Sequence, residues 1–177
     1  MKDKLILFVA QGFGVGRIPF APGTFGSVVG LGWFALLLAT GNIWLFALGT
    51  ILGLAASVWF CGRAEKILGQ TDPGSVVLDE IAAIPVCFAF IILGSYLSDG
   101  RLIDLHPSRI DWYVRGIHFG LFRLFDIWKP WPIRASQKLP GGWGITIDDL
   151  LAAIYVNIGW SVFFGVLVRL GLIVGQY

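Results

Sequence analysis

Charged side chains are scarce in this chain. Of its 177 residues, 14% are Asp, Glu, Lys or Arg and 56% are hydrophobic, and the mean hydropathy is +0.79. This composition is too apolar for an ordinary soluble domain and is typical of a small polytopic membrane protein. The net charge of +2 gives no indication of nucleic-acid binding. The length predicts a single domain over residues 1–177.

Histidine and cysteine are also scarce, with two of each. Cys61 and Cys87 lie in apolar segments without the spacing of a metal knuckle, so we expect two buried small side chains. Neither has an arginine six positions later, as a cysteine-dependent phosphatase requires. His106 lies in a hydrophilic loop and His118 in the middle of a predicted helix. Phosphohistidine, zinc and Ser-His-Asp chemistries therefore lack their histidines.

Long apolar segments predict an all-α fold, a membrane helical bundle with about four to five spanning helices. The candidate spans are residues 28–40, 43–60, 79–97, 113–128 and 147–170. Pro85 is expected to kink the third of them. Residues 5–13 are too short to cross ~30 Å of hydrocarbon and predict a short N-terminal interfacial or re-entrant helix. No small-residue cleavage site follows this segment, so we expect no signal-peptide cleavage.

A loop rich in glycine and proline, GFGVGRIPFAPGTFGS, occupies residues 12–27. Its glycine spacing, with no preceding strand, does not fit a dinucleotide-binding fingerprint. Pro22-Gly23 predicts a turn, and Thr24 is placed to cap the next helix. The free N–H groups from Thr24 to Ser27, with Arg17 nearby, would then form an anion site. The loop alone favours a simpler alternative, a capped helix start with a structural arginine.

Carboxylates stand at the edges of the apolar segments, where an unpaired charge is costly. Asp126 lies among aromatic residues and can pair with Arg123, three positions earlier on a helix. The others occur as two adjacent pairs, one at the start of the third predicted span and one at the start of the fifth. These pairs are Asp79-Glu80 and Asp148-Asp149.

The basic residues predict how the chain crosses the membrane. If all five segments span, one side carries Lys2, Lys4, Arg17, Arg63, Lys66, Lys129, Arg134 and Lys138. The other side carries the hydrophilic loop 98–112, with Arg101 and Arg109. The positive-inside rule makes the first side cytoplasmic. All five carboxylates and the 17–27 loop then meet at the cytoplasmic surface, which predicts a site there.

The residue types in this predicted site indicate its chemistry. Carboxylates without sulfur or imidazole favour a hard divalent cation, Mg²⁺ first and Mn²⁺ second. Arginines, a lysine and a helix N-terminus beside that cation suit a phosphate or phosphate ester. The combination predicts metal-dependent phosphoryl transfer at a lipid surface. A transporter is one alternative, but it should carry carboxylates mid-helix along a pathway. A structural membrane protein, the other alternative, would need no such cluster.

Four sequence blocks carry a family resemblance. They are GRIPFAPGTFGS (16–27), VVLDEIAA (76–83), FRLFDIWKPWPIR (122–134) and GGWGITIDDLLAA (141–153). Through them the chain resembles the phosphatidylglycerophosphatase A family over nearly its whole length. The resemblance implies a helical bundle with one central helix. It also implies a Mg²⁺-dependent phosphatase of the bacterial inner membrane, converting phosphatidylglycerophosphate to phosphatidylglycerol. Besides this substrate and the lipid bilayer, we expect no obligatory protein partner.

The resemblance and the charge pattern together suggest roles for the site residues. Our hypothesis is that Glu80, Asp126 and Asp149 hold Mg²⁺. Either Asp79 or Asp148 would be the general base for an attacking water, and an aspartyl-phosphate intermediate is an open alternative. The expected phosphate- or headgroup-binding residues are Arg17, Thr24, Ser27, Lys129 and Arg134. The tryptophans expected at the membrane interface are Trp128, Trp131 and Trp143.

Overall fold

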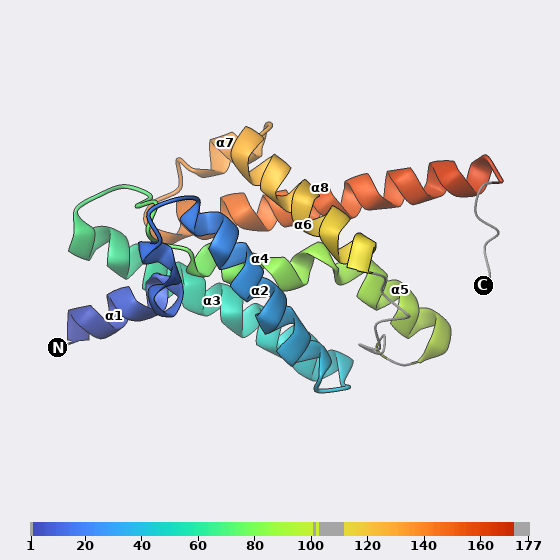
Figure 1. Cartoon of the computed structure of the whole chain (residues 1–177), viewed down its shortest axis with the longest axis horizontal. Helices are drawn as coiled ribbons and strands as arrows, with labels where there is room; N and C mark the ends of the chain where they lie inside the picture. The colour runs from blue at the N-terminus through green and yellow to red at the C-terminus, as the bar shows by residue number, and fades with distance from the viewer. Residues whose placement is uncertain (1, 101, 103–111, 172–177) are drawn as a thin grey trace.

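The computed structural model describes residues 2–100, 102 and 112–171, and within these ranges the regular elements are all helices (Figure 1). The all-α prediction is confirmed. Most of the predicted hydrophilic loop 98–112 lies outside the described residues. The elements are α1 Lys2–Ala10, the 3₁₀ segment η1 Gly12–Arg17, α2 Pro22–Leu38, α3 Ile43–Leu68, α4 Leu78–Cys87, α5 Ala89–Asp99, α6 Trp112–Trp128, α7 Ile133–Ser136 and α8 Gly142–Arg169.

Fewer helices than predicted are long and apolar enough to cross a membrane. In the described part of the chain three qualify by length and composition: α3, the α4–α5 segment Leu78–Asp99, and α8. The apolar α2 has 17 residues, about 26 Å at 1.5 Å per residue, which falls short of the ~30 Å core. The equally short α6 carries Arg115 and Arg123. The predicted number of four to five spans was therefore too high.

Two helices begin earlier than the sequence suggested. Helix α2 begins at Pro22 rather than near Thr24, because proline's fixed φ suits the first helical turn. Helix α8 begins at Gly142, five residues before the predicted start at position 147. Tertiary packing explains this early start. A Cβ on Gly62 of α3 would lie only 2.7 Å from the backbone nitrogen of Gly142, so the two backbones touch without side chains between them.

Helix α4 is the centre of the bundle. It packs against α2, α3, α6 and α8, and most of its side chains are buried. The single central helix implied by the family resemblance is therefore present. Its surroundings explain why these residues are apolar: Ala82, Ala83 and Ile84 are almost fully buried, and Ile84 packs against Gly30 of α2, where a side chain would not fit.

The predicted kink after Pro85 is confirmed as a break between α4 and α5 at Phe88. Asn157 of α8, which is buried, bonds to the backbone on both sides of this break. Its Oδ1 accepts from the Phe90 N–H at 2.9 Å, and its Nδ2 donates to the Val86 carbonyl at 2.7 Å. Backbone groups freed by a broken helix need such partners inside a membrane.

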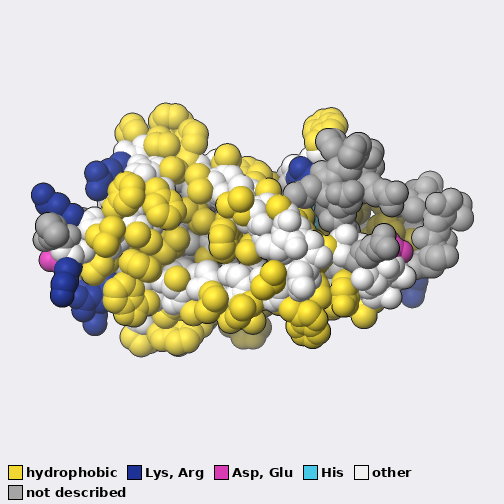
Figure 2. Space-filling model, turned by 90° about the horizontal axis from the view of Figure 1, so that it is seen from below, with side chains coloured by type: hydrophobic (Ala, Val, Ile, Leu, Met, Phe, Trp, Pro, Cys, Tyr) yellow, Lys and Arg dark blue, Asp and Glu magenta, His cyan; other side chains and the backbone are white. Residues whose placement is uncertain are grey.

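The helices divide the molecule into two ends. Helix α1, the loop 69–77 and the start of α8 lie at one end, on the left in Figure 1. The turn between α2 and α3 and the end of α8 lie toward the other. Hydrophobic side chains cover much of the surface between the ends, and Lys and Arg side chains gather at the end where α1 lies (Figure 2). This arrangement agrees with the grouping of loops that the basic residues predicted.

Candidate active site

Three carboxylates from two helices meet near the end of the molecule where α4 and α8 begin. Asp79 and Glu80 lie in the first turn of α4, and Asp149 lies about two turns into α8. One oxygen from each lies within 4.8 Å of the other two. Asp79 and Asp149 are 6% and 3% exposed. Such close, buried carboxylates repel one another unless a cation or protons lie between them.

Asp126, at the end of α6, lies beside these three residues, which we call the acidic trio. Its carboxylate interacts electrostatically with those of Glu80 and Asp149. The structure thus brings together all three predicted metal ligands, and Asp79 as well. Arg123 Nη1 binds Asp126 Oδ2 at 2.7 Å, so the predicted pairing across one helical turn is confirmed.

Arg123 is a site residue that the sequence reasoning did not include. Besides pairing with Asp126, its Nη1 lies 3.9 Å from Glu80 Oε1 and donates to the Ser27 hydroxyl at 3.5 Å. This arginine therefore connects α6 with α4 and α2, and its side chain is only 17% exposed. The pairing with Asp126 was the one sequence signal. The contacts with the other two helices depend on the tertiary fold.

Gly23 brings the start of α2 against this arginine. A Cβ at this position would overlap Glu80 Oε1 and lie 3.2 and 3.3 Å from the two terminal guanidinium nitrogens of Arg123. Only glycine leaves that space free. The first-turn N–H of Gly23 has no backbone carbonyl partner within the described residues, and the positive end of α2 lies beside Glu80 and Arg123.

Thr24 does not cap α2, as the sequence had suggested. The residue before the helix is Ala21, in a left-handed conformation with φ +44° and without a side-chain cap, and the Thr24 N–H donates to the Ala21 carbonyl at 2.9 Å. Ser27 is buried and its hydroxyl donates to the Gly23 carbonyl at 2.9 Å. The predicted row of free N–H groups from Thr24 to Ser27 was therefore wrong at its start, because the N–H groups of Thr24 and Phe25 both donate to the Ala21 carbonyl.

Arg17 occupies a different environment from the carboxylates. It is exposed, and its Nε donates to Gln11 Oε1 at 2.9 Å. Gln11 in turn donates to the Ser75 hydroxyl at 3.2 Å. No ion pair joins Arg17 to a carboxylate in the described ranges. The contacts of Arg17 therefore link η1 to the loop before α4.

Asp148 faces a different partner from its neighbour Asp149, because successive helical residues point about 100° apart. Lys129 Nζ binds Asp148 Oδ2, and Gln137 Nε2 donates to the same oxygen at 3.2 Å. Lys129 Nζ also lies 4.0 Å from Asp126 Oδ1. Asp148 is therefore paired with a cation, whereas Asp149 belongs to the acidic trio.

Lys129 remains a cation in this setting. Its partial burial would by itself lower the pKa of its ammonium group. The hydrogen bond to Asp148 and the charges of Asp148, Asp126 and Asp149 outweigh burial and raise that pKa above its ordinary value. The site therefore has two fixed positive charges, Arg123 and Lys129, beside its carboxylates.

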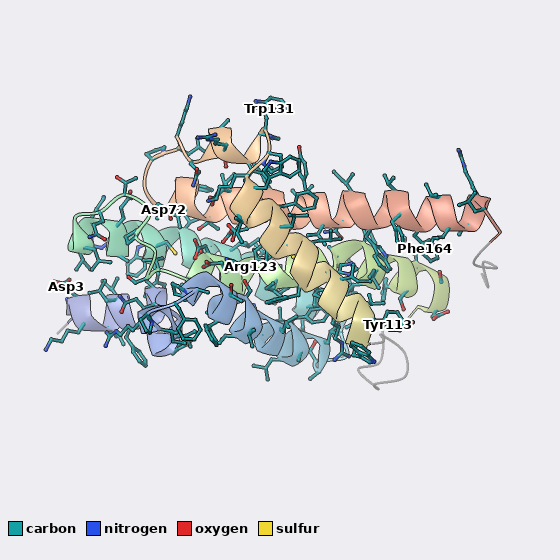
Figure 3. All side chains as sticks on the ribbon, turned by 45° about the horizontal axis from the view of Figure 1, so that its top comes forward. Asp3, Asp72, Tyr113, Arg123, Trp131 and Phe164 are labelled. Atoms are coloured by element: carbon teal, nitrogen blue, oxygen red, sulfur yellow. The ribbon has the colours of Figure 1, made fainter. Side chains whose placement is uncertain are left out.

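Arg134 lies on α7, outside this inner group. It is exposed and, with Lys129, Lys138 and other residues, lines an open groove. Two of the tryptophans predicted at the interface, Trp128 and Trp131, line the same groove and are 68% and 81% exposed. Figure 3 shows Arg123 in the interior and Trp131 projecting from the surface.

Comparison with known proteins identifies related sequences along most of the chain. A family model described as phosphatidylglycerophosphatase A matches residues 8–164. A protein of that name from Haemophilus influenzae is 38% identical over 154 residues, covering 86% of this chain and 85% of the relative. The Escherichia coli protein of that name is 35% identical over 159 residues, covering 89% and 81%.

A further relative carries a different name. A Bacteroides thetaiotaomicron protein, provisionally named a phosphatidylinositol-3-phosphatase, is 34% identical over 155 residues. The match covers 85% of this chain and 88% of that relative. No solved structure matches the chain.

Proposed function

This chain belongs to the phosphatidylglycerophosphatase A family and is a phosphatase, and we propose that it hydrolyses the phosphomonoester of phosphatidylglycerophosphate. The products are phosphatidylglycerol and inorganic phosphate. The observation that carries this proposal is the acidic trio, whose oxygens lie within 4.8 Å of one another, beside the cations Arg123 and Lys129. Carboxylates suit a divalent cation and the two basic residues suit a phosphate.

Mg²⁺ is the proposed cofactor, and the donor set fits it. Mg²⁺ prefers oxygen ligands and is commonly held by one or two carboxylates together with substrate phosphates and water. Asp79 Oδ1 and Glu80 Oε2 are buried without a hydrogen-bond partner in the described part of the chain. Glu80, Asp126 and Asp149 would hold the ion, and Asp79 would lie beside it. When bound, it would neutralise phosphate charge and lower the pKa of an attacking water.

The remaining residues of the site would bind the phosphate and move the proton. Arg123, Lys129 and the N–H of Gly23 would stabilise the negative charge of the phosphoryl group in the transition state. Asp148 already binds Lys129 and Gln137, which favours Asp79 over Asp148 as the base that accepts the proton of water. Attack by a carboxylate to form an aspartyl-phosphate remains the alternative route.

The proposed location is the bacterial inner membrane, with the site at the cytoplasmic surface. Three candidate spanning helices and the apolar surface between the two ends (Figure 2) support insertion. Arg63 and Lys66 lie in the last turns of α3, near the start of α8 and its carboxylates. The positive-inside rule places such an end in the cytoplasm.

Release of inorganic phosphate from phosphatidylglycerophosphate by the detergent-purified protein tests this proposal. We expect activity with Mg²⁺ and none with EDTA, and loss of activity in both Glu80→Gln and Asp149→Asn. Asp3→Asn, an exposed carboxylate on α1, is the matched control. Phosphatidylinositol 3-phosphate is the comparison substrate, because of the name of the Bacteroides relative.

Each outcome of this experiment has a definite meaning. Activity that survives EDTA would contradict the metal assignment. Full activity in both substituted proteins would show that the site lies elsewhere. Faster turnover of phosphatidylinositol 3-phosphate than of phosphatidylglycerophosphate would show that the inositol lipid is the better substrate and would contradict the proposed one.

A further inference from the structure

An open groove next to the charged site includes two basic residues, Arg134 and Lys138, whose charges no carboxylate of the described chain neutralises. Its lining includes Lys129, Arg134 and Lys138, and none of its lining residues is acidic. Within the described residues the side chains of Arg134 and Lys138 have no ion pair. Lys129 is shared: it lines the groove and also binds Asp148 and Asp126. The groove and the charged site therefore share one residue, Lys129.

The groove has a fixed backbone. Ile133 of α7 is fully buried, and α7 packs on α8. The Tyr155 hydroxyl of α8 donates to the Trp131 carbonyl at 2.7 Å. These contacts hold the segment 130–136 against the helix that carries Asp148 and Asp149. A fixed position relative to the catalytic carboxylates is what a second binding subsite for one substrate requires.

The groove also has the side chains of a lipid–water boundary. Trp128 and Trp131 are largely exposed, and tryptophan is enriched at the level of lipid headgroups. Arginine and lysine beside them suit a phosphate at that level. The charge and the aromatic residues together indicate an anionic lipid headgroup as the occupant.

We propose that this groove binds the phosphodiester of the same lipid whose phosphomonoester is cleaved at the acidic trio. The inference rests on the proposed function, because phosphatidylglycerophosphate carries both phosphates, separated by one glycerol. Lys129 lies between the two subsites, and Arg134 and Lys138 bind the phosphodiester alone. The groove thereby selects lipids with a second phosphate over simple phosphomonoesters.

Product inhibition separates the two subsites, since phosphatidylglycerol carries only the phosphodiester and inorganic phosphate mimics only the phosphomonoester. The variant is the double substitution Arg134→Gln and Lys138→Gln, assayed in neutral detergent micelles with phosphatidylglycerophosphate. We expect its Ki for phosphatidylglycerol to rise about tenfold, as for loss of one charge-assisted hydrogen bond, and its Ki for phosphate to rise less than twofold. Lys4→Gln, an exposed lysine on α1, is the matched control.

Three results would overturn the inference. The Ki for phosphatidylglycerol could stay unchanged, or both Ki values could rise together, in which case the groove is not a separate subsite. Phosphatidylserine could inhibit as strongly as phosphatidylglycerol and lose this effect in the same variant, which would make the groove a contact for bulk anionic lipid. Failure of the proposed function is a distinct result, because the unsubstituted protein would then release no phosphate from phosphatidylglycerophosphate.

Discussion

Replacing either of two adjacent aspartates should change the stability of the metal-free protein in opposite directions. Asp149 belongs to the acidic trio, with carboxylate oxygens of Asp79 and Glu80 within 4.8 Å. Asp148 binds Lys129 and Gln137 instead. Asp149→Asn removes a repelling charge, whereas Asp148→Asn removes the partner of a half-buried lysine. We therefore expect the first substitution to raise the melting temperature in EDTA and the second to lower it.

The size of each effect follows from the geometry. Two unit charges 4.8 Å apart repel by about 3 kcal/mol at an effective dielectric constant of ~20. Partial protonation relieves some of this, and we expect Asp149→Asn to gain about 1–2 kcal/mol. Loss of the charge-assisted bond to Lys129 should cost about 1–2 kcal/mol. For a chain of this size, either change moves Tm by about 2–8 °C.

Tryptophan fluorescence of the detergent-solubilised protein, which has eight tryptophans, is a suitable assay of thermal unfolding. Melting curves are recorded in EDTA and in saturating Mg²⁺ for the unsubstituted protein, both variants and Asp3→Asn. A ligand at 100 times its Kd stabilises the folded state by about 2.7 kcal/mol. Mg²⁺ should therefore raise the Tm of the unsubstituted protein, Asp3→Asn and Asp148→Asn, and have little effect on Asp149→Asn.

The opposite pattern would refute this reasoning. If Asp149→Asn melts below the unsubstituted protein in EDTA while Asp148→Asn does not, the repulsion has been assigned to the wrong residue. If Mg²⁺ raises the Tm of all four proteins equally, the ion binds away from the acidic trio.

Three further predictions concern the surroundings of the site. Gly23→Ala should reduce turnover by about 10²-fold with little change in Tm, because the added Cβ would displace the end of the Glu80 side chain and no backbone atom. Gly32→Ala is the control for turnover and for Tm, because the space around Gly32 is open. Arg123→Gln should lower kcat by about 10²–10³-fold. Arg123→Lys should restore only part of the lost kcat, because one ammonium group cannot reach Ser27, Glu80 and Asp126 together. Full activity of Arg123→Lys would show that the positive charge alone suffices. In intact cells a membrane-impermeant maleimide should label Ser98→Cys but not Leu139→Cys. The background should be low because Cys61 and Cys87 are buried. The reverse labelling would show that the topology is opposite to the one proposed.

Local sequence patterns predicted the elements better than their ends. The break after Pro85 was readable because proline lacks an amide hydrogen. The boundary between the predicted spans 28–40 and 43–60 was readable too, and Asn42 caps the second helix by accepting from the N–H groups of Trp44 and Leu45. The start of α8 was not readable, because GGWG has low helix propensity. Contact with α3 at Gly62 overrides that propensity. The number of spans was overestimated because α2 and α6 have only 17 residues each, and α6 also carries two arginines.

The carboxylates of the candidate site were predictable from the sequence, but their arrangement was not. The carboxylates were recognisable because each is a charge at the edge of an apolar segment. The pairing of Asp148 with Lys129 and the grouping of Asp149 with Asp79 depend on the rotation of α8, which its packing against α3, α4 and α6 determines. The role of Arg123 depends on three helices meeting, and no single-helix pattern contains that information.

Asn157 restricts the relative movement of the two helices that carry the acidic trio. This side chain ties the broken end of α4 to α8, eight residues or about 12 Å along α8 from Asp149. Hydrogen bonds therefore hold α4 and α8 together at a point distant from the carboxylates that repel one another. These hydrogen bonds limit how far the carboxylates can move apart when no cation is present. The ion would then enter a site whose two helices are already held together, and only small movements would accompany its binding or release.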